Sequence, residues 1–109
     1  MKSYQKYKDQ VKLLLLVLPI VGKQKMFALH GGTAINLFHF DMPRLSVDID
    51  LTYILVEERV NSLNNINNGL KAIKVEINKT YPRLMVDHKA KETKLFISDK
   101  KALVKLKVN

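Results

Sequence analysis

The segment that most restricts the fold of this chain runs from Val47 to Tyr53, where apolar and polar side chains alternate. A period of two is typical of a β-strand that buries one face and leaves the other open. The apolar positions are Val47, Ile49 and Leu51, and the polar positions are Asp48, Asp50 and Thr52. A chain with such a strand has to form a sheet with a hydrophobic layer on one side and carboxylates on the other.

The two aspartates, Asp48 and Asp50, are the first candidates for chemistry. Two residues apart on a strand, their carboxylates project from the same face. Like charges held this close repel each other and favour divalent cations, and oxygen ligands suit Mg²⁺. A second metal ion would complete the clamp used for in-line phosphoryl displacement. The alternative interpretation is a solvated strand face without a ligand.

A second candidate is the sequence Gly31-Gly32-Thr33, which follows the short apolar run Met26 to Leu29. We expect that run to be a buried strand, and we expect Thr33 to open a helix. Glycines let the backbone approach a phosphate closely, and a helix N-terminus offers free N–H groups. Thr33 could cap that helix or donate its hydroxyl to a phosphate oxygen. A tight strand-to-helix turn with a capping threonine is the structural alternative.

Arg44 and Ser46 lie just upstream of the aspartates at alternating positions. They share the aspartates' side of the strand if it extends back that far. Arg44 could then bind a phosphate or form a salt bridge with the aspartates. Both interpretations stay open.

The remaining pattern predicts an α/β (α+β) domain in which helices flank a small mixed sheet. We expect helices at about 3–18 (ended by Pro19 and Gly22), after Thr33 (with Ala34, Leu37 and Phe38 at helical spacing), and at 57–78, the last broken in two by Asn64, Asn65, Asn67, Asn68 and Gly69. We expect a loop at 41–44 and strands at 84–88, 94–97 and 103–108.

Composition limits the classes of function. The 109 residues fit one domain, and the absence of cysteine excludes disulfides, thiolate metal sites and a cysteine nucleophile, in keeping with a cytoplasmic protein. The net charge of +9 would attract nucleic acid or nucleotides, although 16 lysines against 3 arginines could also reflect background composition. The apolar run from Leu13 to Val21 is too short to span a bilayer, so we interpret it as buried helix and expect no membrane association.

The combination of these motifs is more specific than any one of them. The stretches Phe-Ala-Leu-His-Gly-Gly-Thr-Ala-Ile-Asn-Leu from Phe27 and Arg-Leu-Ser-Val-Asp-Ile-Asp-Leu from Arg44 resemble the AbiEii/AbiGii-type nucleotidyltransferase toxins, within the DNA-polymerase-β-like nucleotidyltransferase superfamily. The resemblance implies that Gly31, Gly32 and Thr33 hold nucleotide phosphates and that Asp48 and Asp50 bind Mg²⁺. It also implies transfer of a nucleotide from an NTP, in several members to tRNA, within a toxin–antitoxin or phage-defence pair, so that an antitoxin or a complementary chain is an implied partner.

The sequence departs from that family pattern in two places. A third carboxylate is expected on a later strand, but the corresponding stretch is Lys105-Leu106-Lys107-Val108-Asn109, with Lys107 at the acidic position. Asp87 and Asp99 are the nearest substitutes, and Lys105 matches a lysine that the resemblance implies near the phosphates.

The second departure is length. Such toxins usually continue into a helical C-terminal half, so we expect residues 1–109 to be a single nucleotidyltransferase-like domain without it. Three hypotheses follow: an active Mg²⁺-dependent nucleotidyltransferase, a degenerate or truncated module that binds nucleotide, RNA or a protein partner without turnover, and a basic nucleic-acid-binding domain that does not use the aspartates.

Overall fold

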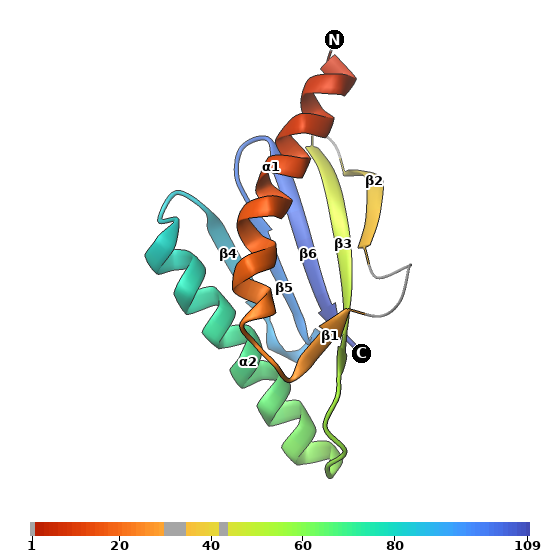
Figure 1. The fold of residues 1–109 in the computed structure, drawn as a ribbon, viewed down its shortest axis with the longest axis vertical. Helices are drawn as coiled ribbons and strands as arrows, with labels where there is room; N and C mark the ends of the chain where they lie inside the picture. Colours follow the sequence, from red (N-terminus) through yellow and green to blue (C-terminus); the bar gives the residue numbers. More distant parts are fainter. Residues whose placement is uncertain (1, 30–34, 42–43) are drawn as a thin grey trace.

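The computed structural model describes residues 2–29, 35–41 and 44–109. Within these ranges the chain forms one six-stranded sheet with two long helices on one of its faces, as Figure 1 shows. The elements are α1 (Lys2–Gly22), β1 (Phe27–Leu29), β2 (Ile35–Asp41), β3 (Arg44–Tyr53), α2 (Arg59–Thr80), β4 (Met85–Lys89), the short 3₁₀ helix η2 (Ala90–Glu92), β5 (Lys94–Ser98) and β6 (Ala102–Val108).

The sheet is mixed, and its strand order is β1-β3-β6-β5-β4, with β2 also paired to β3. β3 and β6 run parallel, whereas the other neighbours are antiparallel. A parallel pair needs a crossover connection, and α2 with β4 and β5 supplies it. The predicted α/β (α+β) class with a small mixed sheet is confirmed, as are the strands near 84–88, 94–97 and 103–108.

α1 is longer than expected, because Pro19 does not end it. Proline removes one hydrogen bond, to the carbonyl four residues earlier, and here that residue, Leu15, is 62% exposed, so water can reach it. Beyond the proline, Ile20 and Val21 are buried in the core and hold the last turn in place. The apolar run from Leu13 is therefore buried helix, as expected. Among the described residues no helix is both long and apolar enough to cross a membrane.

α2 is also continuous, so the expected break at the asparagine cluster and Gly69 is wrong. Gly69 is buried inside the helix, and a Cβ atom there would lie 2.8 Å from Cζ of Phe27 and 3.0 Å from Sδ of Met26. The glycine thus permits close packing of α2 on the start of β1. Asn64 and Asn68 are exposed, whereas Asn65 donates to Glu57, and Asn67 donates to the carbonyl of Ala90 and contacts His88.

The helix expected after Thr33 is wrong where the structure describes the chain, because Ile35–Asp41 is the strand β2. It pairs antiparallel with β3, from Ile35 opposite Ile49 to Asp41 opposite Arg44, with a shift in register between Asn36 and His39. A short apolar run fits both periodicities, and cross-strand pairing decides between them. Two residues of the predicted loop at 41–44 belong to strands, Asp41 to β2 and Arg44 to β3, and residues 42–43 lie outside the described part of the chain.

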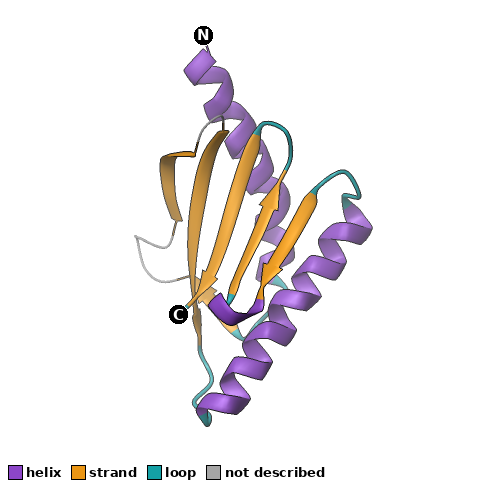
Figure 2. Ribbon diagram, turned by 180° about the vertical axis from the view of Figure 1, so that it is seen from behind, coloured by secondary structure: helices purple, strands orange, loops and turns teal. Residues whose placement is uncertain are grey.

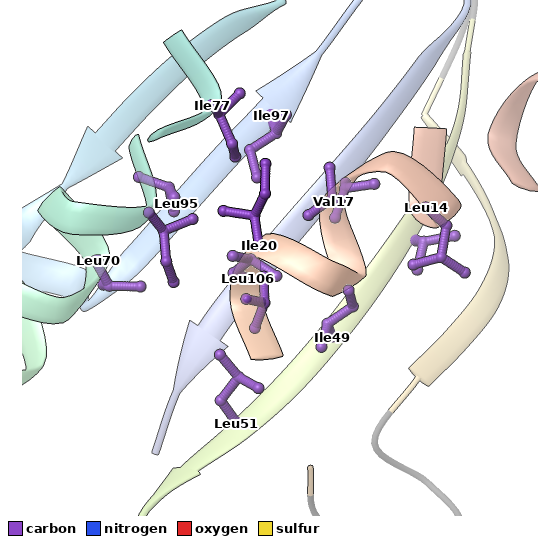
Figure 3. Packing of buried hydrophobic residues seen from close by; sticks show 14 of the residues in the cluster. Leu14, Val17, Ile20, Ile49, Leu51, Leu70, Ile77, Leu95, Ile97 and Leu106 are labelled. Carbon is purple, nitrogen blue, oxygen red and sulfur yellow. The ribbon is translucent and has the colours of Figure 1, made fainter. Parts of the chain in front are cut away.

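The hydrophobic core lies between the sheet and the helices, as the close-up in Figure 3 shows. The apolar residues of β3 sit in it with no exposed surface at Val47 and Ile49, and Leu95, Ile97 and Leu106 of the neighbouring strands are equally buried. α1 contributes Val17 and Ile20, and α2 contributes Leu70, Ile73 and Ile77. The alternation read from the sequence of β3 is confirmed, and it leaves the aspartates on the opposite face.

Candidate functional site

The side of the sheet away from the two helices is not covered by another helix of the described chain, as the two opposite views show (Figures 1 and 2). Because alternate residues of β3 enter the core, Asp48, Asp50 and Thr52 lie on this open face, each half-buried. The Cα atoms of Asp48 and Asp50 are roughly 7 Å apart, because a strand rises about 3.4 Å per residue. The two aspartates thus share the open face of the strand, as the alternation predicts, and their role in a site stays a prediction.

Lysines from β6 lie directly beside the aspartates. In the parallel pairing, Asp48 is opposite Lys105 and Asp50 is opposite Lys107. Lys105 is half-buried and Lys107 is exposed. Asp48 and Lys105 both take part in polar or electrostatic interactions. Each aspartate therefore has a lysine as its neighbour on β6.

The aspartates and lysines line one cavity of about 330 Å³. The lining residues are Asp48, Asp50, Lys94, Phe96, Lys105, Leu106 and Lys107. A neighbouring cavity of about 350 Å³, reaching to Met85 and Asp87, shares Phe96 and Lys105 with it. The two hollows together form a trough whose walls carry three aspartates, three lysines and the ring of Phe96.

Lys94 and Phe96 were not singled out from the sequence. The signal was present, because the strand at 94–97 also alternates, with Leu95 and Ile97 as its buried positions. What could not be read from sequence is that β5 pairs with β6 in the register that sets Phe96 beside Lys105 and Lys94 beside Lys107. Lys94 also lies 3.7 Å from a carboxylate oxygen of Glu92.

Neither substitute for a third carboxylate reaches the pair. Asp87 is in the same lateral row as Asp48, but on β4, three strands away and so about 14 Å distant at ~4.8 Å per strand. Its carboxylate lies 3.2 Å from Nζ of Lys89. Asp99 closes the turn before β6, accepting hydrogen bonds from the backbone N–H groups of Lys101 and Ala102 at 2.7 and 2.8 Å. Among the described residues no three acidic, histidine or cysteine side chains gather as a metal-binding group.

The donor set therefore suits one magnesium ion better than two. Mg²⁺ typically binds one or two carboxylates, completing its shell with waters and substrate phosphates, and Asp48 with Asp50 can supply that many. A two-metal centre needs further anionic ligands around ions about 4 Å apart, and the adjoining strand offers ammonium groups instead.

The described residues do not include Gly31, Gly32 and Thr33, but they include the strands on both sides of this segment. Leu29, the last residue of β1, pairs with Leu51, and Ile35, the first of β2, pairs with Ile49. Both flanks thus meet the same edge of β3 on either side of Asp50. Since Ile35 begins a strand, the described chain does not provide the helix that was expected to point its N-terminus at a phosphate.

Arg44 and Ser46 belong to the same strand as the aspartates, because β3 starts at Arg44. Ser46 pairs with Leu103 of β6 and with His39 of β2. Their side chains lie outside what the structure describes, so their predicted contacts with phosphate stay predictions.

The far end of β3 is tied to α2 by polar contacts. Tyr53 donates a hydrogen bond to Oε1 of Glu57, and Asn65 donates to the same oxygen at 3.1 Å. The hydrogen bond raises the pKa of the Tyr53 hydroxyl, and together the two donors lower the pKa of the Glu57 carboxyl. These contacts fix the exit of the strand from the site.

A hollow of about 700 Å³ lies between the end of α1 and α2, and Glu76 is the one carboxylate among its lining residues. A smaller hollow with charged walls lies between α1 and the ends of β4 and β5. It has about 380 Å³ and is lined by Asp9, Lys12, Leu13, Leu16, Arg83, Asp99, Lys100 and Lys101. Arg83 contacts Asp99 at 3.5 Å, and Asp99 already serves the turn. Neither of these hollows has a pair of carboxylates on one strand, so we take the trough beside Asp48 and Asp50 as the candidate site.

Comparison with known proteins places the chain in a family. The sequence model described as "Nucleotidyl transferase AbiEii toxin, Type IV TA system" matches residues 12–109. No curated protein and no solved structure matches the chain. The match covers α1 from Lys12 onward and every strand of the described sheet.

Proposed function

The chain belongs to the family of AbiEii nucleotidyl transferase toxins of type IV toxin–antitoxin systems, and from this premise we propose that Asp48 and Asp50 form the site of an Mg²⁺-dependent nucleotidyl transfer. The substrate is an NTP, and the acceptor is tRNA or another polyanion. The observation that carries the proposal is the pair of carboxylates on the open face of β3, set in a cavity whose other charged residues are lysines.

The chemistry follows from what these side chains can hold. The hydroxyl oxygen of the acceptor bonds to the α-phosphorus of the NTP, the bond from that phosphorus to the bridging oxygen breaks, pyrophosphate leaves, and the hydroxyl proton is lost to water. A Mg²⁺ ion bound with the nucleotide would supply charge neutralisation on the phosphate oxygens. Asp48 and Asp50 would hold that ion, and Lys105, beside Asp48, neutralises phosphate charge directly.

The glycine segment is the other part of the proposed phosphate site. Its flanks pair with Leu51 and Ile49, so a phosphate held by Gly31, Gly32 and Thr33 has Asp50 as its neighbour on the adjoining strand. Arg44 and Ser46, on the same strand as the aspartates, complete the proposed nucleotide contacts. Substitution of any of these five residues should weaken binding of an NTP to the purified chain in Mg²⁺.

The acceptor and setting are also part of the proposal. A net charge of +9 favours a nucleic acid over a neutral acceptor, and tRNA offers a terminal hydroxyl next to a phosphate backbone. We place the reaction in the cytoplasm, where tRNA and NTPs occur, and we infer an antitoxin encoded as its counterpart. Residues 1–109 are proposed to act as one domain.

The experiment is transfer of label from each radiolabelled NTP, in Mg²⁺, to total tRNA. Asp48→Asn and Asp50→Asn should each lower the transfer by at least about a hundredfold, the size of effect seen when one group that stabilises transition-state charge is removed. Asp87→Asn is the matched control, because Asp87 is a carboxylate on the same face that contacts Lys89 instead. Transfer that survives both site substitutions would sink the proposal.

A second candidate function is a module that binds nucleotide without turnover. The observation that favours it is Lys107, which stands beside Asp50 where an acid is expected. It requires that the wild-type chain bind NTP in the presence of Mg²⁺, lose this binding in Asp50→Asn, and transfer no label to any acceptor. Any turnover by the isolated chain excludes it.

A further inference from the structure

Four residues form a lateral row across the open face of the sheet. Asp50 on β3 is opposite Lys107 on β6, Lys107 is opposite Lys94 on β5, and Lys94 is opposite Lys89 on β4. Neighbouring strands are ~4.8 Å apart, so the side chain of Lys107 is long enough to reach either of its neighbours in the row, Asp50 or Lys94. One carboxylate is therefore followed by three lysines.

The lysines nearest the aspartates line the same cavity. Asp48 and Asp50 contribute two negative charges to its wall, whereas Lys94, Lys105 and Lys107 contribute three positive ones. Nζ of Lys94 lies 3.7 Å from a carboxylate oxygen of Glu92, while Lys107 is exposed. Even before a cation enters, the wall is not anionic.

This charge distribution admits one divalent cation more readily than two. A cation between Asp48 and Asp50, carried in on the nucleotide's phosphates, has two carboxylates and the phosphate oxygens as ligands. A second cation about 4 Å further along would approach Lys107, whose charge repels it and which has no lone pair to offer while protonated. The same ammonium attracts phosphate oxygens, so it neutralises charge that a second cation would otherwise neutralise.

We propose that Lys107 occupies the position of a second metal ion, so that this site works with a single divalent cation bound together with the nucleotide. The inference rests on the proposed function of the Asp48–Asp50 site. Lys105 and Lys107 then have different roles, because Lys105 is half-buried beside Asp48 whereas Lys107 is exposed beside Asp50, where the second cation would bind.

The test counts bound Mn²⁺ per bound nucleotide, by equilibrium dialysis with a non-hydrolysable NTP analogue and electron paramagnetic resonance of the free Mn²⁺. The wild-type chain should hold one Mn²⁺ per nucleotide. Lys107→Asp, which puts a carboxylate in place of the ammonium, should hold two, with the second bound about tenfold or more tightly than any second ion in the wild type. Lys107→Glu is the second variant, in case one acidic side chain has the wrong reach.

Lys79→Asp is the control for charge. It makes the same two-unit change at an exposed lysine of α2, in the helix layer on the other face of the sheet, and should leave the count at one. Circular dichroism melts establish that each variant is folded, which the exposure of Lys107 favours.

The outcomes distinguish a failure of this inference from a failure of the proposed function. Two Mn²⁺ per nucleotide in the wild type overturn the role of Lys107 and leave the proposed transferase site standing. A count that stays at one in both acidic variants also overturns it. If the wild type binds no nucleotide and Lys107→Asp binds none either, the proposed function fails and the inference fails with it.

Discussion

Adjacent residues of β3 should respond to substitution in opposite ways, because one side of the strand is core and the other is site. Ile49 has no exposed surface, whereas Asp50 is half-buried on the open face. Ile49→Ala removes three carbon groups at about 0.8 kcal/mol each. The cavity left behind adds about 1–2 kcal/mol, because the strands around it relax only partly. We expect a loss of about 3–4 kcal/mol in the free energy of unfolding.

Asp50→Asn keeps the shape of the side chain and touches no core atom. We expect its free energy of unfolding to stay within about 0.5 kcal/mol of the wild type. Binding of an NTP analogue should behave in reverse: lost in Asp50→Asn, and kept in Ile49→Ala at a temperature where that variant is still folded. The two substitutions therefore test the structural and the functional assignment of one strand together.

The assay is thermal and urea unfolding followed by circular dichroism, with nucleotide binding measured on the same samples. For a chain of this length, 3–4 kcal/mol corresponds to a fall in Tm of roughly 10–20 °C. The reasoning is refuted if Ile49→Ala costs less than about 1 kcal/mol, or if Asp50→Asn destabilises the fold as much as Ile49→Ala does. Either result would mean that β3 does not present these faces.

Two further predictions concern the contacts between α2 and the sheet. Gly69→Ala should gain about 1 kcal/mol of helix propensity but lose about 1–3 kcal/mol because its Cβ presses against Phe27, so the variant should melt at a lower temperature than the wild type. Adding Phe27→Leu should relieve the clash and restore the gain. A higher Tm for Gly69→Ala alone would contradict the packing. Burial, and then the charges of Lys74 and Lys71, lower the pKa of His88 in the folded chain. The contribution of His88 to stability is therefore complete above its usual pKa of 6.5 and is lost as pH falls below that value toward its folded-state pKa. Between pH 7.5 and 5, Tm should fall less in His88→Gln than in the wild type, and identical profiles would exclude this role.

The sequence predicted β3 correctly because a strand with one buried face leaves its period in the residues themselves. Val47 to Tyr53 alternates without interruption, and the structure buries the apolar members and half-exposes the polar ones. The pairing of Asp48 with Asp50 needs only this local geometry. The resemblance of the chain to a nucleotidyltransferase family, read from the stretches that begin at Phe27 and Arg44, is confirmed over residues 12–109.

The errors came from breakers and short runs, whose effect depends on tertiary contacts. Pro19 did not end α1, because Ile20 and Val21 are buried beyond it, and Gly69 did not break α2, because Phe27 packs against it. Ile35–Asp41 became a strand through pairing with β3. In each case a partner far along the chain or in another layer outweighed the local propensity.

The lysines beside the aspartates could not be predicted from any local pattern in the sequence. Asp50 meets Lys107 only because β6 returns parallel to β3 after α2, β4 and β5 have crossed over, and the register of that pairing decides whether a lysine or a buried residue stands beside the carboxylate. A shift of one residue would bring Leu106 or Val108 to this position and turn both lysines toward the helices, where their charges would be buried. The hydrophobic residues of β6 therefore fix the register, and the register in turn sets the lysines beside the aspartates. The packing of the core thus determines the electrostatics of the site.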